Sequence, residues 1–139
     1  MVETERIADV MGERDMQSIA ALNEAVAEGL PKSALRNTMR HLFGNSPEQM
    51  RFIYRIVPEA TFKRRKERLT EAESERTERV ARVIATAEYV LEDRGLAKRF
   101  LTNPHPMLGG KTPIETAISE LGARQVEQLL FGIFYGLPA

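Results

Sequence analysis

Apolar positions along most of the chain recur every three or four residues, the period of a helix with one buried side. This pattern predicts one helix within residues 15–29, which Gly29 ends, and a second within residues 30–44, which starts at Leu-Pro. Residues 1–14 have only a short apolar spacing, which fits either a short helix or a frayed arm. No segment of useful length alternates with period two, so we expect an all-α protein without strands.

Three candidate capping boxes mark further helix starts, since each places Glu or Gln three residues after a Ser or Thr. They begin at Ser46, Thr70 and Thr112. The helix that begins after Ser46 ends at Ile-Val-Pro, residues 56–58, because the residue before a proline avoids helical geometry. A helix over residues 58–67 follows. The sequence therefore predicts a helix-turn-helix at this place.

The second capping box opens the longest predicted helix, residues 71–92, which Gly95 ends or bends. Its apolar positions form one stripe that we expect to be buried, namely Val80, Val83, Ile84, Ala87, Val90 and Leu91. A short helix stops at Asn-Pro, residues 103–104. The third capping box then starts a helix that Gly122 ends, and residues 123–135 form the final helix.

The length of 139 residues fits one interdependent helical body. We expect a helix-turn-helix-like region in residues 1–69, packed through the long helix onto a small α-helical module within residues 70–139.

The totals narrow the class of protein further. Lys plus Arg and Asp plus Glu are 20 each, so any preference for nucleic acid must be local. The absence of Cys excludes a disulfide framework and a thiol nucleophile. No apolar run could span a bilayer, and the first residues lack the order of a signal peptide. We expect a protein of the cytoplasm that does not associate with membranes.

The helix after the predicted turn is strongly basic and is the candidate DNA-binding element. Arg and Lys side chains in a recognition helix contact guanine edges or phosphates in the major groove. The candidate contacts are Thr61, Lys63, Arg64, Arg65, Lys66 and Arg68. The alternative is a solvated helix end, where cations are favourable. The turn lacks the glycine that many such motifs use, so both interpretations stay open.

Leu-Gly-Gly-Lys-Thr at residues 108–112 invites comparison with a phosphate-binding loop, but the comparison fails. His105 stands where that motif needs its first glycine, and no strand precedes the loop. Gly109 and Gly110 instead predict positive φ in a turn of fixed shape. His41 is expected to be a half-buried helix residue, and the acids of the long helix to form ion pairs with arginines four residues on. We expect no metal and no cofactor.

The last helix carries more aromatic residues than its own core should need. Val126, Leu129, Leu130 and Ile133 form its core-facing stripe. Phe131 and Tyr135 lie beside that stripe, Phe134 lies at its edge, and an apolar tail follows at residues 136–139. Aromatic residues of this kind favour a protein interface. Alternatively, they only broaden the core face.

The motifs of the C-terminal part occur in a specific order. They are Arg-Phe-Leu-Thr-Asn-Pro at 99–104, Leu-Gly-Gly-Lys-Thr-Pro at 108–113, Gly-Ala-Arg-Gln-Val-Glu-Gln-Leu-Leu at 122–130 and Tyr-Gly at 135–136. In this order and spacing the chain resembles the Xre/MbcA/ParS family of antitoxins. Residues 29–35, 61–66 and 69–76 also resemble the family's Xre-like helix-turn-helix region.

The resemblance implies that the protein is an antitoxin of a type II toxin–antitoxin system and not an enzyme. Such antitoxins cover the NAD cleft of a RES-domain toxin, an NAD hydrolase or ADP-ribosyltransferase, and often repress their own operon as DNA-binding homodimers. The toxin-binding residues implied here are Asn103, Pro104, Leu108, Gly109, Gly110, Lys111, Gln128, Phe131, Tyr135, Gly136, Leu137, Pro138 and Ala139. The alternative is a helix-turn-helix transcription regulator whose C-terminal helices serve only dimerisation.

Overall fold

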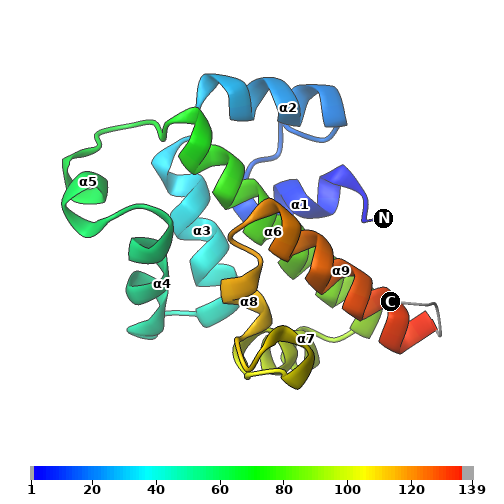
Figure 1. Ribbon diagram of the computed structural model, residues 1–139. Coiled ribbons are helices and arrows are strands. Elements are labelled where there is room, and N and C mark those ends of the chain that lie inside the picture. Colours follow the sequence, from blue (N-terminus) through cyan, green and yellow to red (C-terminus); the bar gives the residue numbers. More distant parts are fainter. Residues whose placement is uncertain (1, 136–139) are drawn as a thin grey trace.

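The computed structural model describes residues 2–135, without the side chains of residues 133–135, and confirms the all-α prediction (Figure 1). The N-terminal part comprises α1 (Thr4–Met11), α2 (Ile19–Glu28), α3 (Lys32–Phe43), α4 (Glu48–Ile56) and α5 (Glu59–Arg64). The C-terminal part comprises α6 (Glu71–Leu91), α7 (Arg94–Thr102), the 3-10 turn η1 (Pro106–Leu108), α8 (Pro113–Thr116) and α9 (Glu120–Tyr135). Within the described residues, no helix is long and apolar enough to cross a bilayer.

The long helix α6 lies at the centre of the fold and is buried on more than the predicted stripe (Figure 1). Val80, Val83 and Ile84 are buried as predicted, but Ala81 and Ala85 on other sides are buried too. Small alanine side chains let neighbouring helices approach closely, and α1, α3, α7 and α9 all pack against α6. One helix therefore carries both the N-terminal and the C-terminal elements.

The first residues form a helix that belongs to the core. Ile7 and Met11 of α1 are buried, and α1 packs against α3 and α6. The following helix α2 starts at Ile19, later than predicted, because the Ser18 hydroxyl accepts a hydrogen bond from the Ala21 N–H and caps it. Ile19 itself is 68% exposed, so the predicted apolar side of α2 is only partly buried.

Two of the three predicted capping boxes are confirmed, at Thr70 and Thr112. The one at Ser46 is wrong, because its hydroxyl donates to the Phe43 carbonyl at the end of α3. The predicted role of Gly95 is also wrong. The long helix ends earlier, where Glu92 takes left-handed φ of 54°.

The predicted helix break at Gly122 is wrong as well, since α9 begins at Glu120 and runs through this glycine. The break lies before α9, after the short α8. A Cβ at Gly122 would collide with the carbonyl oxygen of Thr116. The glycine is therefore explained by this close approach and not by helix termination.

Candidate binding surfaces

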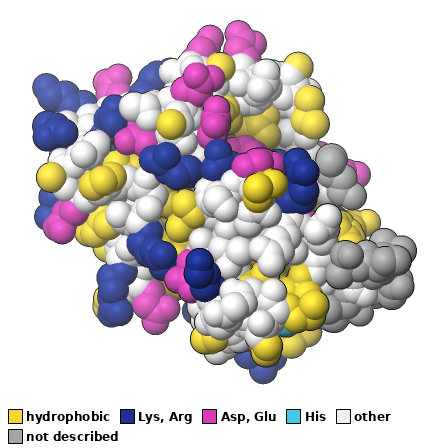
Figure 2. Space-filling view, in the orientation of Figure 1, with side chains coloured by type: hydrophobic (Ala, Val, Ile, Leu, Met, Phe, Trp, Pro, Cys, Tyr) yellow, Lys and Arg dark blue, Asp and Glu magenta, His cyan; other side chains and the backbone are white. Residues whose placement is uncertain are grey.

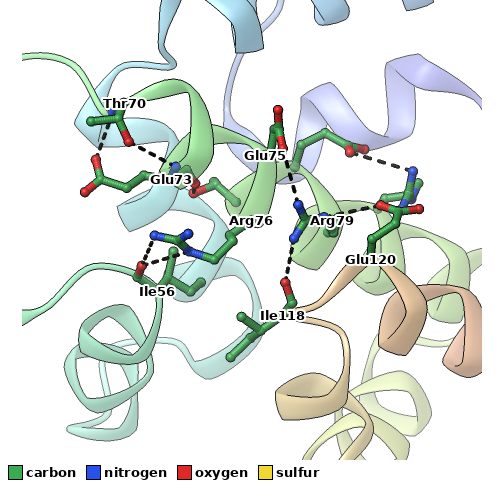
Figure 3. A network of polar contacts seen from close by, with 11 residues as sticks. Ile56, Thr70, Glu73, Glu75, Arg76, Arg79, Ile118 and Glu120 are labelled. Carbon is green, nitrogen blue, oxygen red and sulfur yellow. Dashed lines mark hydrogen bonds and ion pairs between the residues drawn. The ribbon is translucent and has the colours of Figure 1, made fainter.

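The predicted helix-turn-helix consists of α4 and α5, joined by Val57 and Pro58. Phe62 anchors α5 in the core, where it is 1% exposed and meets the Tyr54 ring edge-on at 6.3 Å. The guanidinium of Arg76 in α6 donates twice to the Ile56 carbonyl, from Nε at 3.1 Å and Nη2 at 2.9 Å (Figure 3). These contacts hold the turn against the long helix without a glycine.

The helix α5 is shorter than predicted and ends at Arg64, so the basic cluster is divided between a helix and an extended segment. Residues 65–69 run beside residues 30–32, with hydrogen bonds from Lys32 N–H to the Glu67 carbonyl and from Leu69 N–H to the Leu30 carbonyl, both 2.8 Å. This long-range pairing stops α5, and local sequence gave no signal for it.

Two of the six candidate DNA-binding residues stabilise this pairing. Arg65 forms an ion pair with Glu73 at 2.9 Å, and Arg68 donates to the Gly29 carbonyl at 2.8 Å. Gly29 has φ of 101° and a Cβ there would collide with the Leu69 carbonyl oxygen. The side chains of Arg65 and Arg68 therefore connect the start of α6 and the end of α2 to the segment after α5.

Three of the other four candidates, Lys63, Arg64 and Lys66, face solvent from α5 or just after it. Arg64 and Lys66 are exposed and form no ion pair with any described residue, whereas Lys63 pairs with Glu59 at 2.7 Å. Thr61 is half-buried. Figure 2 shows Lys and Arg side chains gathered over the side of the molecule that carries α5 in Figure 1. Arg64 and Lys66 are the cations most available to a partner.

The C-terminal candidate surface begins with the turn between α7 and α8. The backbone N–H of His105 donates to the Lys111 carbonyl at 3.0 Å, and that of Gly110 donates to the His105 carbonyl at 3.1 Å. Gly109 and Gly110 have φ of 66° and 80°, which confirms the predicted positive φ. Asn103 ends α7, its amide donating to the Arg99 carbonyl at 2.6 Å. Backbone hydrogen bonds within the turn therefore define its conformation.

The candidate toxin-binding residues of this turn are partly exposed and partly buried. Pro104, Gly109, Gly110 and Lys111 are exposed, whereas Leu108 is 6% exposed and packs into the core beneath them. The outward surface of the turn therefore consists of backbone at the two glycines and of exposed side chains, among them Lys111 and Met107, which is 62% exposed. Leu108 supports that surface from inside the protein.

An ion pair between Arg55 and Glu115 joins α4 to the capping box that follows this turn. Glu115 accepts from the Thr112 N–H at 2.9 Å and from Arg55 Nη1 at 2.6 Å. These bonds from Arg55 and the Thr112 backbone lower the pKa of the Glu115 carboxyl below its usual range. The sequence predicts the capping role of Glu115 but not its bond to Arg55, which lies 60 residues away along the chain.

The last helix presents a mixed surface. Val126, Leu129 and Leu130 are buried, as predicted, and Gln128 is exposed. Phe131 is half-buried and packs against the core, which favours the interpretation that it broadens the core face. The side chain of Tyr135 and the tail of Gly136, Leu137, Pro138 and Ala139 lie outside the described residues, and so do the side chains of Ile133 and Phe134.

Ion pairs fix α9 on the long helix, in the network of Figure 3. Arg79 contacts Glu120 at 3.3 Å and donates to the Ile118 carbonyl at 2.8 Å. Arg82 contacts Glu127 at 3.4 Å and Glu78 at 3.7 Å. Burial raises the pKa of the Glu78 and Glu127 carboxyls despite these arginines. The predicted pairs of the long helix, Glu75 with Arg79 and Glu78 with Arg82, are both present.

The histidines serve structural contacts. His41 is half-buried, as predicted, and its Nε2 lies 2.8 Å from Glu88 of α6. Nδ1 of His105 accepts from the Met107 N–H at 3.1 Å, and its ring meets Phe100 edge-on. In the part of the chain that the structure describes, no three His, Cys, Asp or Glu residues are grouped to hold a metal ion.

Comparisons with known proteins agree with this arrangement. Residues 21–82 match the antitoxin Xre-like helix-turn-helix domain, and residues 86–136 match the antitoxin Xre/MbcA/ParS C-terminal toxin-binding domain. The chain is 40% identical over 84 residues to Antitoxin Xre of Pseudomonas putida, an alignment that covers 58% of this chain and 53% of that relative. The chain thus aligns with about half the length of this curated relative. By both of its domains, the chain belongs to the Xre/MbcA/ParS-type antitoxins.

Proposed function

We propose that this antitoxin binds a RES-domain toxin through its C-terminal module and represses its own operon through α5. The observation that carries the proposal is that the two domains pack, in this order, along one long helix. The helix-turn-helix packs on the start of α6, and α7 and α9 pack along the rest of it. In Figure 1, α5 and the end of α9 lie on opposite sides of the molecule, so one chain has room for two partners.

The toxin-facing surface in this proposal is the turn of residues 103–111 together with the exposed side of α9. Lys111 and Gln128 supply polar contacts, and Tyr135 with the tail of residues 136–139 extends the surface into the toxin's NAD cleft. The fixed hydrogen bonds of the turn support this role, because a preorganised surface loses little entropy on binding. The antitoxin acts by covering the cleft and not by chemistry of its own.

The DNA-facing surface consists of Thr61, Lys63, Arg64 and Lys66, whereas Arg65 and Arg68 shape it from the side. Two subunits would read two half-sites of the operator, as helix-turn-helix repressors do. Both activities belong to the cytoplasm, where operator and toxin meet.

Two variants at the two surfaces test the proposal and serve as each other's control. Lys111→Gln is expected to weaken copurification with a RES-domain protein encoded beside this gene and to leave operator affinity unchanged. Arg64→Gln is expected to lower operator affinity and its salt dependence, because it removes a phosphate or base contact, while toxin binding persists. Both side chains are exposed, so the fold should tolerate either change.

The alternative, a transcription regulator whose C-terminal helices only dimerise, gives a different result. In that case no RES-domain protein copurifies with the wild-type chain, and Lys111→Gln changes nothing but the monomer–dimer equilibrium.

A further inference from the structure

The start of α3 carries two cations that share one aromatic ring. Nζ of Lys32 lies 4.2 Å from the centroid of the Phe62 ring, and Cζ of Arg36 lies 5.3 Å from the same centroid. Phe62 is the buried anchor of α5, so these cations of α3 lie next to the candidate DNA-binding helix.

The two cations have no acidic partner among the described residues. Lys32 Nζ donates only to the Arg65 carbonyl, at 3.0 Å, and Arg36 is exposed without an ion pair. Of the acids in this part of the fold, Glu59 pairs with Lys63 and Glu73 with Arg65, whereas Glu67 is exposed and pairs with no described cation. Burial and then the charge of Arg36 lower the pKa of the Lys32 ammonium.

Like charges that lie near one ring repel each other, whereas cation–π attraction to that ring stabilises each of them. A phosphate group on the open side would neutralise both. Their place also suits a phosphate, because Lys32 Nζ lies 3.0 Å from the Arg65 carbonyl, beside the basic segment that ends α5. Cations of α3 and of this segment then lie close together, as in proteins whose phosphate contacts fix register on a duplex.

We propose that Lys32 and Arg36 of α3 bind the phosphodiester backbone of duplex DNA as a second anchor beside α5. This inference rests on the proposed DNA binding of α5. Phosphate contacts position the protein and carry no sequence information, so the anchor contributes equally on any duplex.

The test is the salt dependence of binding of Arg36→Gln, measured by fluorescence anisotropy with the operon's upstream sequence and with a mixed-sequence duplex. The slope of log affinity against log salt is expected to become shallower by about 0.9 on both duplexes, the value for one lost phosphate contact. Arg36→Lys keeps the charge and should keep the slope. Arg99→Gln, a matched charge change at an exposed site of α7, should behave as wild type.

The possible contrary results are distinct. If Arg64→Gln flattens the slope and Arg36→Gln does not, the α3 anchor is wrong and DNA binding by α5 stands. A loss confined to the operon's own sequence would overturn the phosphate assignment, because it would mean a base contact. If the wild-type chain binds neither duplex, the anchor and the proposed DNA binding fail together.

Discussion

At the scale of the residue, Gly122 shows how one missing side chain sets the position of a helix. The backbone of α9 lies so close to the Thr116 carbonyl that any Cβ would collide with backbone, which cannot move aside as a side chain can. Gly122→Ala should therefore lower the free energy of unfolding by about 1–3 kcal/mol, the usual cost of overpacking. Chemical denaturation followed by circular dichroism measures this change.

Gly95→Ala is the control, because its Cβ would meet only a side-chain oxygen of Asp93, at 3.1 Å, and φ there is not positive. Its effect on unfolding should be clearly smaller. Equal effects of the two substitutions would show that Gly122 has no special packing role.

Single residues were predictable from sequence where the interaction was local. The capping boxes at Thr70 and Thr112 join residues three apart, and both are present. Ser46 has the same local pattern, but its hydroxyl donates to the Phe43 carbonyl at the end of α3 instead. Likewise, the charge of Arg65 was evident and its partner Glu73 was not, because that pairing depends on how the chain folds back after α5.

At the scale of the element, periodicity predicted the helices and packing decided their ends. The short apolar spacing of residues 1–14 left a helix or an arm possible, and burial of Ile7 and Met11 against the core explains why the helix forms. The end of α5 depends on the pairing of residues 65–69 with residues 30–32, a contact between distant segments. Such contacts leave no periodic signal in one sequence.

The contact between α4 and α8 should depend on pH. Because Arg55 and the Thr112 backbone lower the pKa of Glu115, its ionised form stabilises the fold above its usual pKa of 4.5. This contribution is lost as pH falls through the lowered pKa. Glu115→Gln should therefore reduce the free energy of unfolding at neutral pH by less than about 1 kcal/mol, and the difference from wild type should shrink in acid.

Glu78 should behave in the opposite sense and provides the comparison. Burial raises its pKa, so its ionised form opposes folding above that pKa, and the opposition fades as pH falls toward 4.5. Glu78→Gln should leave the protein as stable as wild type, or more stable, at neutral pH. Unfolding curves across this pH range that show the same trend for both variants would contradict these assignments.

At the scale of the whole molecule, α6 places the helix-turn-helix and the C-terminal module on one support. The all-α class and the family were predictable, because helix periodicity and motif order are properties of the sequence itself. The placement of Lys32 and Arg36 beside Phe62 was not predictable, because α3 and α5 come together only in the folded chain. Toxin and DNA binding at these surfaces stay predictions.

The central claim is that the C-terminal module silences an NAD-consuming RES-domain toxin. Its most direct test is the rate of NAD consumption by the purified toxin, encoded beside this gene, as the wild-type chain is added. We predict that the rate falls to zero at saturating chain, that Lys111→Gln requires a higher concentration, and that Arg64→Gln inhibits as well as wild type. NAD consumption that continues unchanged at every concentration of the wild-type chain would contradict the account.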